Sequence, residues 1–187
     1  MRWFTRELNE GVSVTDDDHR RATAEYLANL DGIRDRLPAG FARLANERDR
    51  GFHDGAFTRV TWDLDHSTFE VGLDLLGIDN RYFHVDLRFK DAEVEPFSVP
   101  ALEAAITAVF KRHGSPYVTQ IMDSEVDLVA DGRGVLRLLL IPFHEFEIYA
   151  SDVEVAVAEI AERRATDEPA SFRATRRQWD EEVDEAR

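Results

Sequence analysis

The feature that most constrains the fold is a period-two stretch, Tyr82–Glu95, that changes parity partway along. It reads YFHVDLRFKDAEVE, and every second residue from Phe83 to Phe89 is apolar. Such alternation predicts a strand with one buried face. After Lys90–Asp91 the apolar residues fall on the other parity. One extra residue in a β-bulge, or a tight bend between two strands, produces this change.

The same arrangement returns at Phe143–Ala156. Four residues there align with Phe83, Val85, Leu87 and Phe89, namely His144, Phe146, Ile148 and Ala150. Ser151–Asp152 aligns with Lys90–Asp91, and the parity changes there too. We interpret this as an internal duplication, with repeat A at 53–95 and repeat B at 122–156. Chance matching of strand patterns is the alternative.

The pattern of apolar and turn residues in each repeat predicts three strands joined by tight turns. In repeat B, Ala130–Gly134 carries an Asp-Gly signal that is typical of a hairpin turn. The run that follows, Val135–Ile141, is almost continuously apolar. It predicts a strand that is buried on both faces.

Helical patterns precede each repeat. Thr15 is a good N-cap, and with Asp18 it resembles a capping box before an apolar stripe that ends near Leu37. A second, shorter helix completes a helical region at 15–50. A connecting helix is predicted at 98–113, because Gly114 and Pro116 end its apolar stripe.

The predicted fold is therefore α+β. N-terminal helices and one connecting helix pack on an antiparallel sheet of about six strands, built from two repeated three-stranded meanders. A single domain is expected at 1–165, which is long enough to bury a core. The charged tail at 166–187 is expected to be mobile or to form a docking helix.

Composition limits the class of protein. The hydrophobic content of 43% and charged content of 33% are typical of a globular protein, and no cysteine is present to form disulfides or thiolate metal sites. No apolar run suits a membrane span or a signal peptide, so a cytoplasmic location is expected. The formal net charge of −15 repels nucleic acid and anionic membranes. It favours a basic protein partner, or simple solubility.

No common catalytic motif is present, whether nucleophile elbow, P-loop, Rossmann fingerprint, HExxH or EF-hand loop. One polar set is a candidate site, formed by His84 and Asp86 in repeat A and by Glu145 and Glu147 in repeat B. If the third strands of the two repeats meet, this set could bind a divalent cation or supply paired carboxylates. Its other interpretation is the solvent side of a sheet. No other cofactor is predicted.

The chain opens with Met1-Arg2-Trp3-Phe4-Thr5-Arg6-Glu7, and His53-Asp54-Gly55 precedes its β-rich part. These stretches resemble an uncharacterised bacterial family, a domain of unknown function whose members begin Met-x-aromatic-Phe-Thr-basic-Glu. Members later carry a His-Asp-Ser-like step, and here glycine replaces the serine. The family has no assigned activity, so the resemblance implies a bacterial intracellular protein and no site.

Two functions are consistent with these features. The first is a non-enzymatic interaction module of the adaptor, immunity or inhibitor type, which meets a basic partner. The second is a divalent-cation-binding or metal-dependent hydrolase domain that uses His84, Asp86, Glu145 and Glu147.

Overall fold

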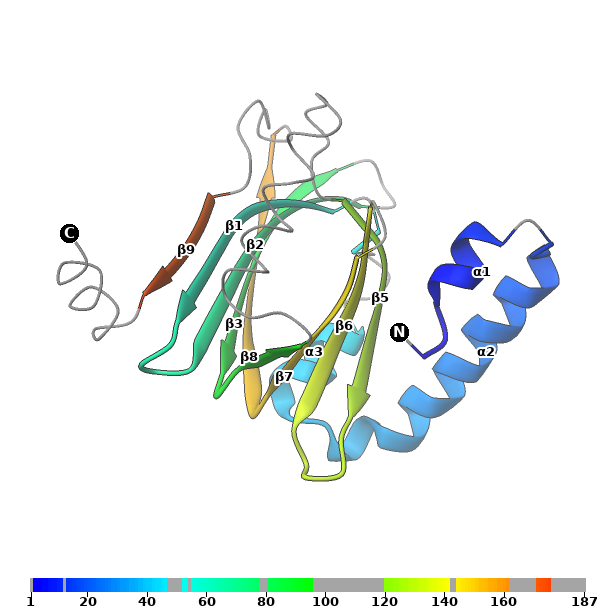
Figure 1. Ribbon diagram of the computed structural model, residues 1–187, viewed down its shortest axis with the longest axis horizontal. Coiled ribbons are helices and arrows are strands. Elements are labelled where there is room, and N and C mark those ends of the chain that lie inside the picture. The colour runs from blue at the N-terminus through cyan, green and yellow to red at the C-terminus, as the bar shows by residue number, and fades with distance from the viewer. Residues whose placement is uncertain are drawn as a thin grey trace, which may run out of the picture.

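A computed structural model describes residues 2–11, 13–46, 52–53, 55–77, 81–95, 120–141, 144–161 and 171–175. The chain is α+β, as predicted (Figure 1). The helices are α1 (Arg6–Glu10), α2 (Asp16–Ile33), the 3₁₀ helix η1 (Arg34–Arg36) and α3 (Ala39–Asn46). The predicted connecting helix at 98–113 lies outside the described residues. Among the helices that are described, none is long and apolar enough to cross a membrane.

The start of α2 confirms the predicted capping box. The Asp18 backbone N–H donates to Thr15 Oγ1 at 3.3 Å, and the Thr15 N–H donates to Asp18 Oδ2 at 2.9 Å. Two N–H groups that the helix leaves unbonded are thereby satisfied.

The strands form the two predicted meanders, β1-β2-β3 and β5-β6-β7, in which each strand pairs antiparallel with the next. Their bounds, with those of the remaining strands, are β1 (Ala56–Asp63), β2 (Thr68–Leu76), β3 (Tyr82–Lys90), β4 (Glu93–Glu95), β5 (Gln120–Leu128), β6 (Gly134–Ile141), β7 (His144–Ala150), β8 (Asp152–Ile160) and β9 (Ser171–Thr175).

Eight of these strands make two antiparallel halves. The first half has the order β1-β2-β3-β8, and the second has the order β4-β7-β6-β5. Among the described residues, β1 pairs directly with β5 only at Ala56 and Gln120. The prediction of a single sheet of about six strands is therefore wrong in detail. The third strand of each meander is divided by a bend, and its continuation lies in the opposite half.

The bend lies where the parity changes. β3 leads into β4 through Asp91, which has a left-handed φ of 51°, and β7 leads into β8 through Ser151. Pairing keeps one register across the corner, since Lys90 lies opposite Asp152 and Glu93 lies opposite Tyr149. The Ser151 N–H donates to the Lys90 carbonyl at 2.9 Å, and its hydroxyl donates to Asp91 at 2.6 Å. Of the two predicted causes, the tight bend is confirmed, and such corners let strands switch sheets.

The strands of repeat B extend beyond the bounds predicted for it. β5 begins at Gln120 and β8 continues to Ile160, so the unit is longer than 122–156 at both ends. Irregularities of the strand register do occur, but in the first strand of each meander, between Phe57 and Arg59 and between Ile121 and Asp123. Asp123 therefore lies inside β5, beside this irregularity.

The core lies between the two halves, whose apolar faces meet (Figure 1). The rings of Phe57 and Phe146 cross the gap, with centroids 6.3 Å apart. Helix α3 adds Phe41, whose ring centroid lies 6.1 Å from that of Phe89. In β6, five residues from both faces are buried, which confirms the predicted double burial: Val135, Leu136, Leu138, Leu139 and Leu140.

Part of the predicted tail is a strand. β9 pairs in parallel with β1, with Ser171 opposite Arg59 and Thr175 opposite Asp63. The expectation of a mobile segment or a helix is wrong for these five residues. The rest of 166–187 lies outside the described residues.

Candidate functional site

The polar face of the first half carries two of the four predicted site residues. Alternation along β2 and β3 places Asp74 opposite His84 and Gly72 opposite Asp86. On the next strand, Ala158 lies opposite His84 and Ala156 opposite Asp86. His84 and Asp86 are thus flanked across the strands by small residues and one carboxylate.

A line of polar contacts, here named the His84 cluster, joins Asp74, His84, Asp86 and Arg59. His84 Nδ1 lies 2.7 Å from Asp74 Oδ1, and His84 Nε2 lies 3.4 Å from Asp86 Oδ1. Arg59 donates to Asp86 at 2.9 Å. The Asp74 side chain is fully buried, that of His84 is 13% exposed and that of Asp86 is 45% exposed. A buried carboxylate on Nδ1 fixes the orientation of the imidazole and leaves Nε2 toward the surface.

Glu147 belongs to a second group, the Arg137 cluster, on the polar face of the second half. The Arg137 guanidinium donates from Nε to Glu147 at 2.7 Å and from a terminal nitrogen to Asp127 at 3.0 Å. The same guanidinium lies 4.0 Å from the fully buried Glu125. The Tyr149 hydroxyl donates to Glu147. This cluster neutralises carboxylates with a nearly buried arginine.

Ionisation in the Arg137 cluster follows from these contacts. Burial raises the pKa of Asp127, but hydrogen bonds from the Leu128 N–H, Arg137 and Asn29 outweigh burial and hold the pKa below its usual value. Burial likewise raises the pKa of Glu147, and the hydrogen bonds from Tyr149 and Arg137 lower it below the ordinary range. Burial, followed by the hydrogen bond to Glu147, raises the pKa of Tyr149 to about 12. Asp127 and Glu147 are therefore charged and paired at neutral pH.

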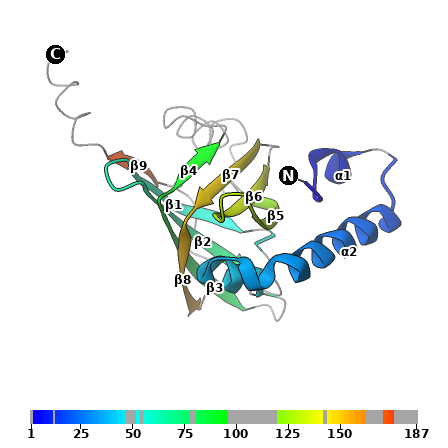
Figure 2. The ribbon, with the colours of Figure 1, turned by 90° about the horizontal axis from the view of Figure 1, so that it is seen from below.

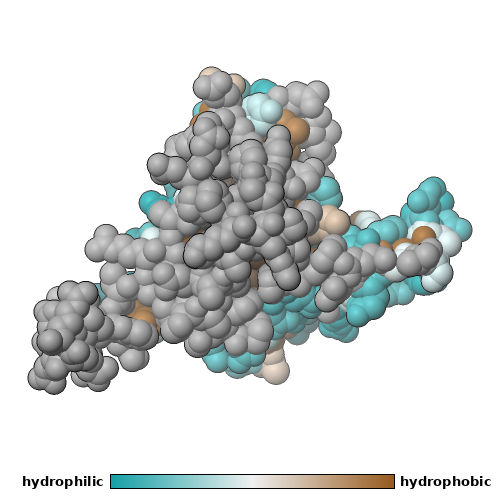
Figure 3. Space-filling view, turned by 45° about the horizontal axis from the view of Figure 1, so that its top comes forward, coloured by the Kyte–Doolittle hydropathy of each residue, from teal (hydrophilic) through white to brown (hydrophobic). Residues whose placement is uncertain are grey.

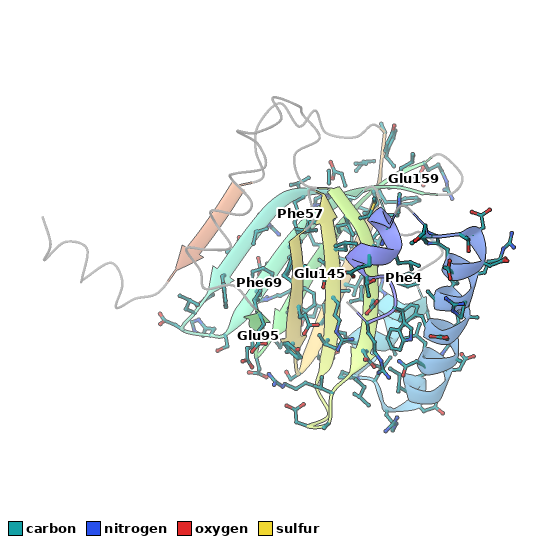
Figure 4. All side chains as sticks on the ribbon, turned by 45° about the vertical axis from the view of Figure 1, so that its right-hand side comes forward. Phe4, Phe57, Phe69, Glu95, Glu145 and Glu159 are labelled. Atoms are coloured by element: carbon teal, nitrogen blue, oxygen red, sulfur yellow. The ribbon has the colours of Figure 1, made fainter. Side chains whose placement is uncertain are left out.

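The four predicted residues do not gather at one point. His84 and Asp86 are adjacent, Glu147 is held by Arg137, and Glu145 lies on β7 opposite Leu139 (Figure 4). Within the described ranges, no group of three or more His, Asp or Glu residues could hold a metal ion. The bend explains the separation, because β3 pairs with β8 and β7 pairs with β4, so the two third strands are not neighbours.

Sequence reasoning overlooked the most buried acidic residues. Asp74 and Glu125 are both fully buried, and no role was assigned to either from the sequence. The partners of Glu125 come from the other end of the chain, Arg2 to Phe4. A contact across more than a hundred residues leaves no local signal in the pattern.

A hollow of about 410 Å³ lies between α1 and α2, here named the α1–α2 hollow. Its lining combines apolar, neutral polar and acidic side chains with one arginine, and consists of Trp3, Thr5, Glu7, Leu8, Ser13, Val14, Asp18, Arg21, Ala22 and Glu25. In Figure 3 this end of the molecule is largely hydrophilic, with a small hydrophobic area. Figure 2 shows α1 and α2 to one side of the strands, and three residues of the lining pack against the core, namely Trp3, Leu8 and Ala22.

The carboxylates of the α1–α2 hollow differ in their partners. The Thr15 hydroxyl and N–H and the Arg21 guanidinium bind Asp18 and lower its pKa. Glu7 and Glu25 are exposed, and neither has an ion partner among the described residues. Within the described part of the chain, these two carboxylates therefore lie beside apolar side chains without an ion partner.

Comparison with known proteins finds no match to any family model, any curated protein or any solved structure. The resemblance of the opening residues to an uncharacterised bacterial family stays an expectation.

Proposed function

We propose that the protein is a non-enzymatic binding module that receives a basic, partly apolar segment of a partner protein in the α1–α2 hollow. The observation that carries the proposal is that Glu7 and Glu25, beside Trp3 and Leu8, have no ion partner among the residues that the structure describes. Carboxylates attract the guanidinium or ammonium of such a segment, and the aromatic and aliphatic side chains of the lining contact its stem.

The charge of the whole chain supports the same partner. A net charge of −15 attracts cationic segments at long range and repels phosphate-rich ligands. Long-range attraction of this kind is screened by salt, with a Debye length of about 10 Å at 0.1 M ionic strength. Binding in the α1–α2 hollow should therefore weaken as salt is added.

A synthetic peptide of alternating arginine and leucine tests the proposal by titration calorimetry on the full chain. We expect binding that weakens with salt, and no binding of the matched peptide with glutamate in place of arginine. Glu25→Lys should weaken binding by about 1.5- to fivefold, because one surface charge pair contributes roughly 0.2–1 kcal/mol. The control is Asp35→Lys, which makes the same charge change at an exposed residue that does not line the hollow.

Two outcomes would count against this function. One is equal weakening by Glu25→Lys and Asp35→Lys, which would mean that only the net charge matters. The other is an arginine–leucine peptide that does not bind the wild-type chain at low salt.

The alternative is a divalent-cation-binding or metal-dependent hydrolase domain, and one observation favours it. A buried carboxylate on His84 Nδ1, with a second carboxylate beside Nε2, is an arrangement found around histidines that bind metals. Thermal melts with Ca²⁺, Mg²⁺, Mn²⁺ and Zn²⁺ test it, since a ligand of the folded state raises the midpoint. We expect any increase to disappear in His84→Ala and to persist in His66→Ala. No increase with any of the four ions would exclude this alternative.

A further inference from the structure

We propose that Glu125 is the positioning residue of the α1–α2 hollow, because it anchors the chain segment that forms one wall of it. The inference rests on the proposed function for its binding readout. The hydrogen bonds of Glu125 do not depend on that function. Glu125 lies on β5, on the polar face of the second half, opposite Arg137.

The Glu125 carboxylate accepts hydrogen bonds from three successive backbone N–H groups. Oε1 accepts from Trp3 at 2.6 Å and from Phe4 at 2.7 Å. The Arg2 N–H reaches Oε1 at 3.1 Å and Oε2 at 2.8 Å. The Glu125 side chain is fully buried, with 0% of its surface exposed to solvent. These are charge-assisted bonds in a dry environment, where such bonds are strongest.

The three N–H groups precede α1, so no helical hydrogen bond competes for them. Thr5 is the N-cap of that helix, and its side chain accepts from the Leu8 N–H at 3.3 Å. The negative charge of Glu125 is also 4.0 Å from the Arg137 guanidinium, which compensates part of it. Glu125 therefore binds the extended backbone just before the helix begins.

Aromatic contacts connect the anchored segment to Tyr26 of α2. The rings of Trp3 and Phe4 lie 5.3 Å and 5.4 Å from that of Tyr26, measured between centroids. The Tyr26 hydroxyl in turn accepts from the Val126 N–H on β5 at 2.7 Å. Figure 4 shows Phe4 between the strands of the second half and α2. The segment is thus held to β5 in two ways, by its backbone bonds to Glu125 and by its ring contacts with Tyr26, which binds Val126.

The α1–α2 hollow depends on this segment. Trp3, Thr5, Glu7 and Leu8 supply one wall, and the other wall comes from α2 and the residues just before it. Glu125 itself does not line the hollow. Loss of the anchor should therefore remove a wall without altering any residue that meets the partner.

Two variants of Arg2 separate the backbone bond from the side chain. Arg2→Pro deletes the N–H that donates to Glu125. Arg2→Ala keeps this N–H but removes the guanidinium, which lies 3.7 Å from Asp127 and 4.6 Å from the Trp3 ring centroid. Glu125→Gln places an amide donor among the N–H donors and is the second test of the anchor.

The readouts, both on the full chain, are amide hydrogen exchange of Trp3 and Phe4 and affinity for the arginine–leucine peptide. We expect Arg2→Pro and Glu125→Gln to speed exchange by roughly ten- to a hundredfold, the effect of one hydrogen bond to a charged group. The affinity for the peptide should fall in the same two variants. In Arg2→Ala, exchange of the Trp3 and Phe4 amides should stay slow.

Each other outcome has a defined meaning. Unchanged exchange in both variants would overturn the anchor, and faster exchange with full peptide affinity would overturn its role in the hollow. If the wild-type chain does not bind the peptide, the proposed function fails. Exchange alone then decides whether Glu125 anchors the segment.

Discussion

At the scale of single residues, buried charge is managed by pairing. Arg137 compensates Asp127 and Glu147, and Glu147 also accepts from the Tyr149 hydroxyl. Partners of this kind hold the pKa of each carboxyl down and that of the phenol up. The cluster is thus stable only while its acids are charged and its phenol is neutral.

Tyr149 makes stability sensitive to alkali. Its pKa is about 12 in the folded chain and about 10 in an unfolded one. Because the folded value is raised, its contribution is complete below about pH 10 and is lost as the pH rises toward 12. Between about pH 10 and pH 12, the free energy of unfolding measured in urea titrations should therefore fall less for Tyr149→Phe than for the wild-type protein. Equal losses in the two proteins would contradict the assignment, and Tyr82→Phe is the control for removing a phenol.

At the scale of elements, close backbone approach decides where α3 lies. A Cβ on Gly40 would lie 1.6 Å from the Val153 carbonyl oxygen of β8, so only glycine fits this contact. The Gly40 N–H donates to Asp152 at 2.8 Å, and Arg43 donates to the Val155 carbonyl at 2.8 Å. These bonds cover the start of the β8 edge with a helix, which is one way that proteins protect exposed strands.

Two glycines in helices should respond with opposite signs. Gly40→Ala should destabilise the protein by about 1–3 kcal/mol, because α3 must move off β8. Gly32→Ala in α2 should stabilise it by roughly 0.5–1 kcal/mol, because nothing lies within 4 Å of the added methyl group and alanine favours helix. Denaturant unfolding measures both. Stabilisation by Gly40→Ala would mean that α3 does not pack on β8 in solution.

At the scale of the whole molecule, the two halves share one core. A single cluster of buried residues includes Val71 and Phe89 from the first half and Leu136 and Phe146 from the second. The bent strands also pair continuously from one half to the other. Neither half has a separate core, so the halves should unfold together.

Phe146→Ala tests whether the two halves unfold together. The substitution lies in β7 of the second half and should cost roughly 3–5 kcal/mol, through lost burial and a cavity beside Phe57. Amides of β2, in the first half, should exchange faster by the same factor as amides of β6 wherever exchange requires global unfolding. Faster exchange confined to the second half would show two independent units. Leu27→Ala, at a side chain that is 44% exposed, is the control.

Local patterns predicted much of the architecture because their causes are local. The capping box of Thr15 and Asp18, the two meanders and the double burial of β6 are confirmed, since hydrogen-bonding side chains and hydrophobic period act within a few residues. The candidate site was predicted less well. His84 and Asp86 lie together, whereas Glu145 and Glu147 do not join them.

By itself, the sequence determined the class of fold, the repeated strand pattern and the position of the bend at Asp91 and Ser151. Tertiary structure alone decided that the bend sends each third strand into the opposite half, which separated His84 from Glu147. It also decided that Glu125 would hold the backbone of Arg2 to Phe4. The physical reason is the same in both cases. Periodicity specifies which face of an element is buried, but the partner on that face is chosen by packing between residues far apart in the chain.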